Sequence, residues 1–475
     1  MTREFTKLGW ALLLLAIPLE VGWSQDNSAP PQAAGTIDDS GTQPVVEPDT
    51  SQVADSSPTT DANNPSIDGG TRLFASSLGA GLHVTGGGQG YFNGMPGSPE
   101  VQPVSSFLGS LDLQKLWRRS QTTLDYVGGA TFNGSYGSAG AYVEQLHSLD
   151  VSQRFSWHRT QVVFRDAFNF LRDGNFGSSS FGGASAYNLR FGENGEGAPG
   201  NTEGDDYLGG TSLGQESFIT NVAAASITEA LNKRSSISVD GAYSISDYSG
   251  YSQSLSNDRQ ITGQLGYKYR LNRRDSISVV YSYQRFQYTL AGVGVITTNS
   301  ARLVYRHRLL TRLDLVLGGG PEVTKVAGSA AANGSQLNAT AQASLQYRKN
   351  NYNLGFSYDR LETGGFGVFA GGNSNIFRLS MGRALSRTWR VSFDGGYAAS
   401  TSIENSPGVP ASSYDYDFAG GAIRRQWGPR LSAFGSYQFN WENSPCGPAT
   451  SCPPGIQQHI VSIGIDWNIR PIHLE

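Results

Sequence analysis

Most of this chain alternates between apolar and polar residues with a period of two. Within residues 337–348, every odd-numbered position is apolar and every even-numbered position is polar. Successive side chains of a β-strand point to opposite faces of a sheet, so this pattern predicts a strand with one apolar and one polar face. Similar runs occupy residues 237–246, 261–270, 352–359, 389–397, 431–441 and 459–470. The pattern predicts a sheet that separates two different environments.

The predicted strands are long. A tilted strand needs about 9–11 residues to cross a bilayer, whereas strands of soluble proteins have about 5–6 residues. The sequence therefore predicts an all-β fold, a transmembrane antiparallel β-barrel of about 18 strands, with 16 as the alternative. We expect these strands at residues 72–83, 104–116, 120–133, 141–156, 159–172, 216–230, 235–248, 258–270, 275–289, 297–309, 312–325, 336–348, 351–362, 374–385, 388–401, 413–426, 429–442 and 456–470.

Short basic turns separate pairs of predicted strands. Examples are Arg118-Arg119, Lys233-Arg234, Arg273-Arg274 and Lys349-Asn350. Most recur roughly every 40 residues, the length of one hairpin plus one longer loop. Aromatic residues cluster beside these turns, namely Trp117, Trp157, Tyr269, Tyr347, Trp389, Trp427 and Trp467. Short turns at one end, long loops at the other and an aromatic girdle at an interface are typical of barrels in the outer membrane.

The N-terminal region predicts export. Arg3 and Lys7 precede the apolar segment Leu8–Ile17, and the small residue Ser24 follows it, which is the order found in a secretory signal peptide. The next segment is rich in Pro, Ser, Thr and Asp and contains too few apolar residues to form a core. We therefore predict a signal peptide at residues 1–24, a disordered acidic periplasmic linker at 25–71 and the barrel at 72–475. The linker is either a spacer or a tether to a periplasmic partner.

The last predicted strand carries a motif with the spacing polar, any, Gly, any, any, apolar, any, apolar. Its members are Ser462, Gly464, Trp467 and Ile469. The motif resembles the terminal β-signal of Gram-negative outer-membrane β-barrel proteins, although this chain continues past the strand to Glu475. The resemblance, which identifies no subfamily, implies a place in the cell outer membrane. It implies contact with membrane lipid and lipopolysaccharide and assembly by the barrel-assembly machinery through edge pairing. It does not decide whether the protein forms a homotrimer.

By the phase of the alternation, charged residues of both signs face the barrel interior. The basic set is Arg154, Arg165, Lys268, Arg270, Arg302, Arg306, Arg378 and Arg390, and the acidic set is Asp112, Asp125, Asp240, Asp314, Asp359, Asp394, Asp415 and Asp417. Two interpretations stay open for these candidate pore-lining residues. Separate basic and acidic ladders would create a transverse field across a water-filled pore, whereas ion pairs along the wall would hold the barrel in shape. Both can apply together.

The longest loop covers residues 174–215 and is the third long loop of the predicted barrel. It is rich in Gly and contains five acidic residues, Glu193, Glu196, Glu203, Asp205 and Asp206. In general diffusion porins the third long loop folds into the lumen and narrows it. If this loop resembles that one, its carboxylates would favour cations. The simpler alternative is an exposed surface loop.

Two cysteines, Cys446 and Cys452, lie close together near the C-terminus. An even number of cysteines in an exported chain predicts a disulfide, which here would close a small loop. A metal site is a poor alternative, because no histidine or second cysteine pair lies beside them.

The sequence gives little support for an enzyme. The string Gly210–Gly214 matches a nucleophile elbow, but it lies in a Gly-rich loop and not at a strand-to-helix turn. The histidines show no metal-binding spacing, and the net charge of -4 argues against a nucleic-acid partner. We expect no catalytic site, no metal and no cofactor. The favoured function is a porin-like channel for passive diffusion of small hydrophilic solutes. The alternative is an accessory or structural barrel associated with exopolysaccharide export.

Overall fold

The computed structural model describes residues 76–92, 100–134, 142–171, 218–248, 257–288, 294–310, 312–327, 334–349, 351–363, 371–403, 413–443, 456–470 and 472–474. All of them belong to one compact unit, Ser56–Glu475. No helix among these residues is long and apolar enough to cross a membrane.

The strands are β1 (Ser77–Phe92), β2 (Glu100–Leu116), β3 (Ser120–Asn133), β4 (Tyr142–Ser156), β5 (Thr160–Leu171), β6 (Phe218–Ala230), β7 (Ser235–Tyr248), β8 (Asp258–Arg270), β9 (Asp275–Tyr288), β10 (Val295–Leu310), β11 (Leu313–Ala327), β12 (Gly334–Lys349), β13 (Tyr352–Thr363), β14 (Gly372–Ala384), β15 (Trp389–Ser402), β16 (Ser413–Gln426), β17 (Leu431–Asn443), β18 (Ile456–Asn468) and the two-residue β19 (Ile472–His473). Each strand from β2 to β17 pairs with its neighbours in the sequence, and all pairings are antiparallel.

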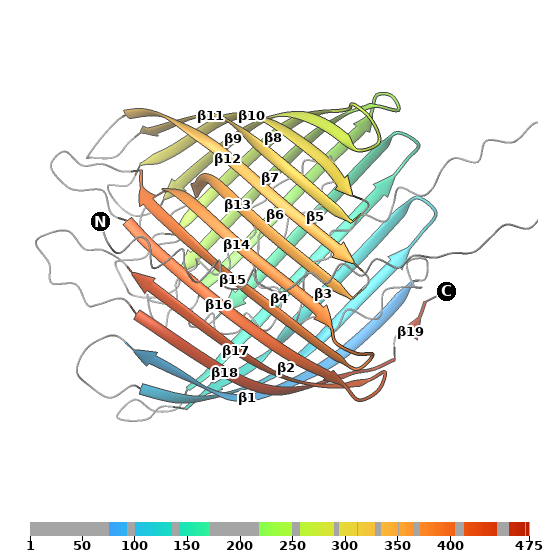
Figure 1. Cartoon of the computed structure of the whole chain (residues 1–475), viewed down its shortest axis with the longest axis vertical. Coiled ribbons are helices and arrows are strands. Elements are labelled where there is room, and N and C mark those ends of the chain that lie inside the picture. Colours follow the sequence, from blue (N-terminus) through green and yellow to red (C-terminus); the bar gives the residue numbers. More distant parts are fainter. Residues whose placement is uncertain are drawn as a thin grey trace, which may run out of the picture. The chain divides into compact units, whose positions relative to one another are not determined.

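The sheet closes on itself. β1 pairs with β2 on one side and with β18 on the other, from Gly81 opposite Asn468 to Phe92 opposite Gln457. The short β19 continues this edge, with Leu78 opposite Ile472. The strands tilt around a barrel with short turns gathered at one end (Figure 1). The prediction of eighteen long antiparallel strands is confirmed, and four of the predicted ranges, 120–133, 235–248, 258–270 and 413–426, match the observed bounds.

The first strand was placed wrongly by the sequence pattern. We expected it at residues 72–83, whereas β1 covers Ser77–Phe92. Glycines 86–88 have no side chains, so this half of the strand shows no alternation. The structure gives Gly87 a packing reason, since a Cβ there would overlap the backbone oxygen of Val461 on β18. Glycine at this position lets the closing strands approach each other.

The two faces of the wall differ in chemistry. On the outer face, Val239, Leu265 and Tyr281 lie opposite one another on three adjacent strands and are 52%, 48% and 47% exposed. On the inner face, the matching row is Asp240, Gln264 and Ser282, which are 6%, 8% and 7% exposed. Large apolar side chains are therefore exposed outward while polar ones are buried inward, the reverse of a soluble protein. Such an outer face is stable only against lipid.

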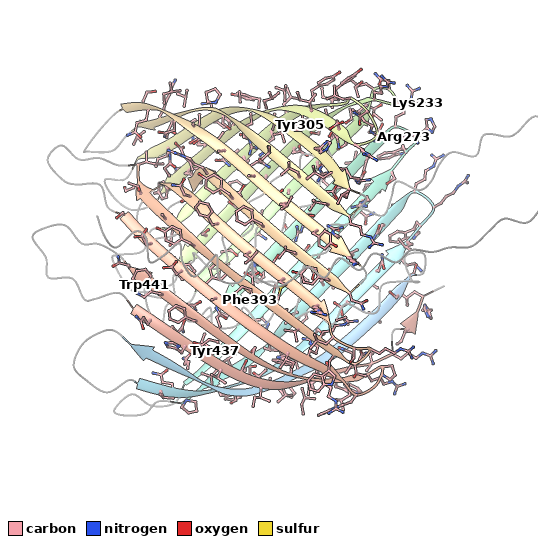
Figure 2. The ribbon with its side chains drawn as sticks, viewed as in Figure 1. Lys233, Arg273, Tyr305, Phe393, Tyr437 and Trp441 are labelled. Carbon is pink, nitrogen blue, oxygen red and sulfur yellow. The ribbon has the colours of Figure 1, made fainter. Side chains whose placement is uncertain are left out.

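The short-turn end carries exposed apolar residues next to cations. Each of seven turns carries one large apolar residue that is between 47% and 62% exposed. These residues are Trp117, Trp157, Leu231, Leu271, Leu310, Leu385 and Trp427. Basic residues follow within three positions in each. Lys233 and Arg273 lie at this end, and Trp441 lies toward the opposite end (Figure 2). This combination of apolar and basic side chains suits a boundary between hydrocarbon and headgroups.

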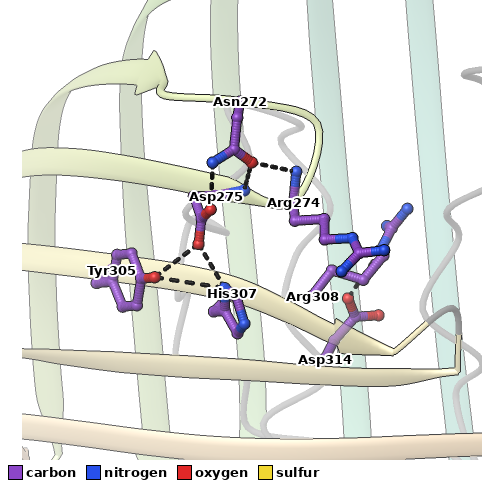
Figure 3. Close-up of polar contacts among 7 residues, drawn as sticks. All are labelled: Asn272, Arg274, Asp275, Tyr305, His307, Arg308 and Asp314. Atoms are coloured by element: carbon purple, nitrogen blue, oxygen red, sulfur yellow. Dashed lines mark hydrogen bonds and ion pairs between the residues drawn. The ribbon is translucent and has the colours of Figure 1, made fainter.

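The turn between β8 and β9 is held by side-chain hydrogen bonds. The Asn272 Oδ1 atom accepts from the backbone N–H groups of Arg274, at 2.7 Å, and Asp275, at 2.9 Å. The Asp275 carboxylate in turn accepts a hydrogen bond from the Tyr305 hydroxyl, at 2.6 Å, and contacts His307 Nδ1 (Figure 3). The turn is thereby fixed to the neighbouring strand β10.

Candidate functional site: the inner face of the barrel

Fourteen of the sixteen candidate pore-lining residues share the inner face, and Asp112 and Asp125 are among them. The strand register places on it Arg154, Arg165, Lys268, Arg270, Arg302, Arg306, Arg378, Arg390, Asp240, Asp314, Asp359 and Asp394. These twelve residues come from nine strands, and on each strand the alternation turns the polar positions toward the same side of the wall. Their role in solute passage stays a prediction.

Two residues of the wider acidic set lie on the opposite face. Asp415 pairs with Ala399 and Asp417 pairs with Tyr397, both on the outside of the wall. The inner positions of this segment are Tyr416 and Phe418, both buried. Aromatic and acidic residues alternate here near the long-loop end, so polarity alone gave the wrong phase. The Tyr397 hydroxyl donates a hydrogen bond to the Asp415 carboxylate at 3.1 Å.

Several inner charges are paired within the wall. Arg165 on β5 binds Asp150 on β4 with both Nε–Oδ distances at 2.9 Å. Arg378 on β14 binds Asp394 on β15 with an Nη2–Oδ2 distance of 2.6 Å and an Nε–Oδ2 distance of 3.1 Å. In both pairs one guanidinium engages both carboxylate oxygens, the strongest geometry for such a pair. These pairs link adjacent strands and brace the wall, as one of the two interpretations predicts.

Inner charges of like sign also gather on two parts of the wall. Asp112, Asp125 and Asp150 lie directly opposite one another on β2, β3 and β4 and form an acidic row. The strand order places β10 to β12 on the far side of the ring from this row. The inner basic residues on β8, β10 and β12 are Lys268, Arg270, Arg302, Arg306, Arg308 and Arg348. The separation by sign is partial, since Asp314 on β11 pairs with Arg308 at 3.1 Å. The transverse field therefore stays a prediction.

A polar cluster around Asp466 on β18 was not predicted from the sequence. Asp466 is buried, with 3% of its surface exposed. Its carboxylate accepts a hydrogen bond from the Ser432 hydroxyl at 3.1 Å and forms an ion pair with Arg424 Nη2 at 3.3 Å. His83 Nδ1 also contacts it. Both His83 and the Arg424 guanidinium stack on the Phe434 ring, at 5.1 and 5.7 Å. The alternation is consistent with an inner position for Asp466, but nothing local in the sequence signals its partners from β1, β16 and β17.

The terminal motif lies on the strand that closes the barrel. Ser462 and Gly464 are on the inner face, and Trp467 is on the outer face. The Ile469 N–H donates to the backbone oxygen of Ala80 on β1 at 2.9 Å. A Cβ at Gly464 would lie 2.5 Å from the Phe434 ring, so the glycine makes room for that ring. Recognition of the motif by an assembly machinery stays a prediction.

Other predicted features lie outside the described residues. They are the signal peptide and linker, the acidic residues Glu193, Glu196, Glu203, Asp205 and Asp206, the pair Cys446 and Cys452, and the string Gly210–Gly214. Among the residues that the structure does describe, no group of His, Cys, Asp or Glu side chains is arranged to hold a metal ion.

Comparison with known proteins gives structural matches alone. No protein-family model and no curated protein sequence matches this chain. Similar solved structures include three proteins of Pseudomonas aeruginosa. OccK5 (OpdH) is 11% identical, with 83% of this chain and 98% of its own covered and a TM-score of 0.40. OccK2 (OpdF) is 10% identical, with 83% and 98% covered and a TM-score of 0.43. OccK7 (OpdD) is 12% identical, with 84% and 99% covered and a TM-score of 0.42.

The fold assignment rests on the chain's own geometry. The antiparallel sheet closes through the β1–β18 ladder. Its outer face exposes large apolar residues and its inner face is polar. A bilayer core admits exposed strands only when they form a closed barrel, because every backbone group must be paired. Single-chain bacterial barrels with an even number of antiparallel strands occur in the outer membrane. This chain is therefore an outer-membrane β-barrel protein.

Proposed function

We propose that the barrel is a channel for passive diffusion of small hydrophilic solutes across the outer membrane. The observation that carries this proposal is the polar inner face. It continues around the ring, as in the row Asp240, Gln264 and Ser282 and in the hydroxyl pair Ser436–Ser462, which lie 2.5 Å apart. Barrels of about 16–18 strands leave an aqueous channel.

Planar-bilayer recording tests this proposal. Purified, folded protein should give discrete open-channel steps, because polar walls of this circumference hold water. Folded protein that inserts without such steps would contradict the channel and would favour the accessory or structural role. Loss of a periplasmic interaction on deletion of residues 25–71 would then point to the linker as a tether.

The charge separation supports selectivity by charge. A solute in the lumen would lie between the acidic row, Asp112, Asp125 and Asp150, and the basic residues of β8, β10 and β12. Opposite charges on facing walls orient a solute that carries both a positive and a negative group. Removal of the acidic or the basic side chains shifts the relative permeability of the channel to cations and anions.

We predict that Asp125→Asn shifts the reversal potential in a salt gradient toward anions. The cation-to-anion permeability ratio should fall about twofold, because the acidic row loses its central carboxyl group. The matched control is Asp166→Asn on β5, an equal change at an exposed outer-face position. If both variants keep the parent reversal potential, the acidic row does not contribute to selectivity.

A further inference from the structure

The wall is interrupted between β12 and β13. Their ladder begins at Lys349 opposite Tyr352 and ends at Ala341 opposite Arg360. Beyond that point β12 continues to Gly334 along β11, and β13 continues to Thr363 along β14. The two strands therefore separate in the half of the wall nearest the long loops.

At the end of β13, charged residues occupy the alternate positions that face lipid in the rest of the strand. The outward-facing positions of this strand are Leu354, Phe356 and Tyr358. Phe356 is 41% exposed. Arg360 and Glu362 continue the same phase, yet Glu362 is only 1% exposed. A charged pair facing hydrocarbon would be costly. The observed burial shows that the strand has left the lipid-facing surface.

Glu362 is held against the inside of the wall. Its carboxylate accepts hydrogen bonds from Thr298 on β10, Thr324 on β11 and Asn338 on β12, the last at 3.2 Å. All three donors occupy inner-face positions. At this end of β13, a side chain from the lipid-facing set of positions therefore contacts the inner face of β10 to β12.

Charges on both sides of this contact balance one another. The Glu322 carboxylate of β11, 4% exposed, lies within electrostatic range of Arg302, Arg360 and Glu362. Two acidic and two basic side chains are thus gathered where the end of β13 meets β10 and β11. A buried carboxylate is tolerated when donors and opposite charges surround it.

The neighbouring strands follow β13 inward. Ile403, after the end of β15, packs in a buried apolar cluster with Phe286, Tyr288 and Ile296 from the inner face of β9 and β10. Gly371, before β14, has a positive φ of 69°, and a Cβ there would overlap Ile296 Cδ1. β15 is five strands away from β10 in the ring. Direct contact between them requires this part of the wall to bend across the lumen.

We infer that these strand ends form a wall-built constriction that sets the size limit for solutes. The ends are Arg360–Thr363 of β13, residues 371–374 at the start of β14 and residues 400–403 at the end of β15, here named the tucked rim. The inference rests on the proposed channel function. The three hydrogen bonds to Glu362 and the Ile296–Ile403 cluster hold the rim in place. Release of these contacts widens the bore.

Crosslinking tests the position of the rim. Cysteines replace Ile296 and Ile403 in a background in which Cys446 and Cys452 are serine, and the folded protein in bilayer vesicles is treated with a short bismaleimide. Peptide mass spectrometry should find the 296–403 crosslink in most molecules, because both side chains belong to one buried cluster. Absence of the crosslink in folded protein would overturn the tucked rim, whatever the protein conducts.

Conductance tests the role of the rim. The double variant T298V/T324V removes two donors to Glu362 while keeping side-chain shape, and its single-channel conductance should rise about twofold. The matched control T123V/S152A removes an inner-face hydroxyl pair, 2.7 Å apart, on β3 and β4 and should leave conductance unchanged. Crosslinking 296 to 403 in the T298V/T324V protein should restore the parent value.

The outcomes separate the two proposals. A crosslinked rim together with equal conductance of T298V/T324V and T123V/S152A would overturn the constriction. If neither the parent nor any variant conducts, the result would instead contradict the channel. The crosslink yield would still decide whether the tucked rim lies inside the barrel.

Discussion

Leu265→Arg should destabilise the barrel by about 2–4 kcal/mol, the cost of a cationic side chain near the middle of the lipid-facing surface. Leu265 lies near the centre of β8 and is 48% exposed on the outer face. Its opposite neighbours Val239 and Tyr281 are also apolar and exposed, so the arginine finds no acidic partner directly across the strands. Reversible unfolding in urea from lipid vesicles measures the change.

The adjacent residue provides the control. Gln264 precedes Leu265 on the same strand and faces inward, so Gln264→Arg places the same charge at the same depth in a polar environment. Asp240 lies directly opposite and can pair with it. The cost should stay near 1 kcal/mol or below. Equal costs for the two substitutions would contradict the assignment of the two faces.

Gly320→Val on β11 should prevent a stable barrel from forming. A Cβ at this position would overlap the backbone oxygen of Ala301 on β10, and it would lie 3.0 Å from the Cα of Arg302. Since the neighbour is backbone, the strands would have to move apart. Even Gly320→Ala should cost about 1–3 kcal/mol, the range for overpacking. Unfolding in urea and the yield of folded protein in vesicles measure the effect.

A second glycine shows whether the effect is specific to that contact. Gly263 on β8 has open space where its Cβ would lie. Gly263→Ala should therefore change stability by about 0.5 kcal/mol or less. A large loss at Gly263, or none at Gly320, would show that close strand approach does not explain the glycine requirement.

The local pattern predicts much of the fold. In β8 the alternation alone gives the strand bounds, the outer position of Leu265 and the inner position of Gln264. The same reasoning fails where side chains are absent or where polarity is ambiguous. Glycines 86–88 concealed the second half of β1, and the sequence Tyr-Asp-Tyr-Asp-Phe ending at Phe418 gave the wrong phase for Asp415 and Asp417.

Contacts between distant strands were beyond the local pattern. Parity places Asp466 inside the barrel, yet its partners Arg424 and His83 come from strands on either side and depend on the closure of the ring. The position of Glu362 depends on the separation of β13 from β12, which the alternation does not encode. One signal was available, since Arg360 and Glu362 continue an apolar outer phase with charges.

Site-directed spin labelling of β8 tests the two-faced wall most directly. Labels introduced one at a time at residues 260–268 in lipid vesicles should show relaxation by oxygen dissolved in lipid at odd positions. Relaxation by a water-soluble nickel complex should dominate at even positions, so the two profiles should have a period of two and opposite phase. Profiles in the same phase, or profiles without this period, would contradict a wall with lipid on one side and water on the other.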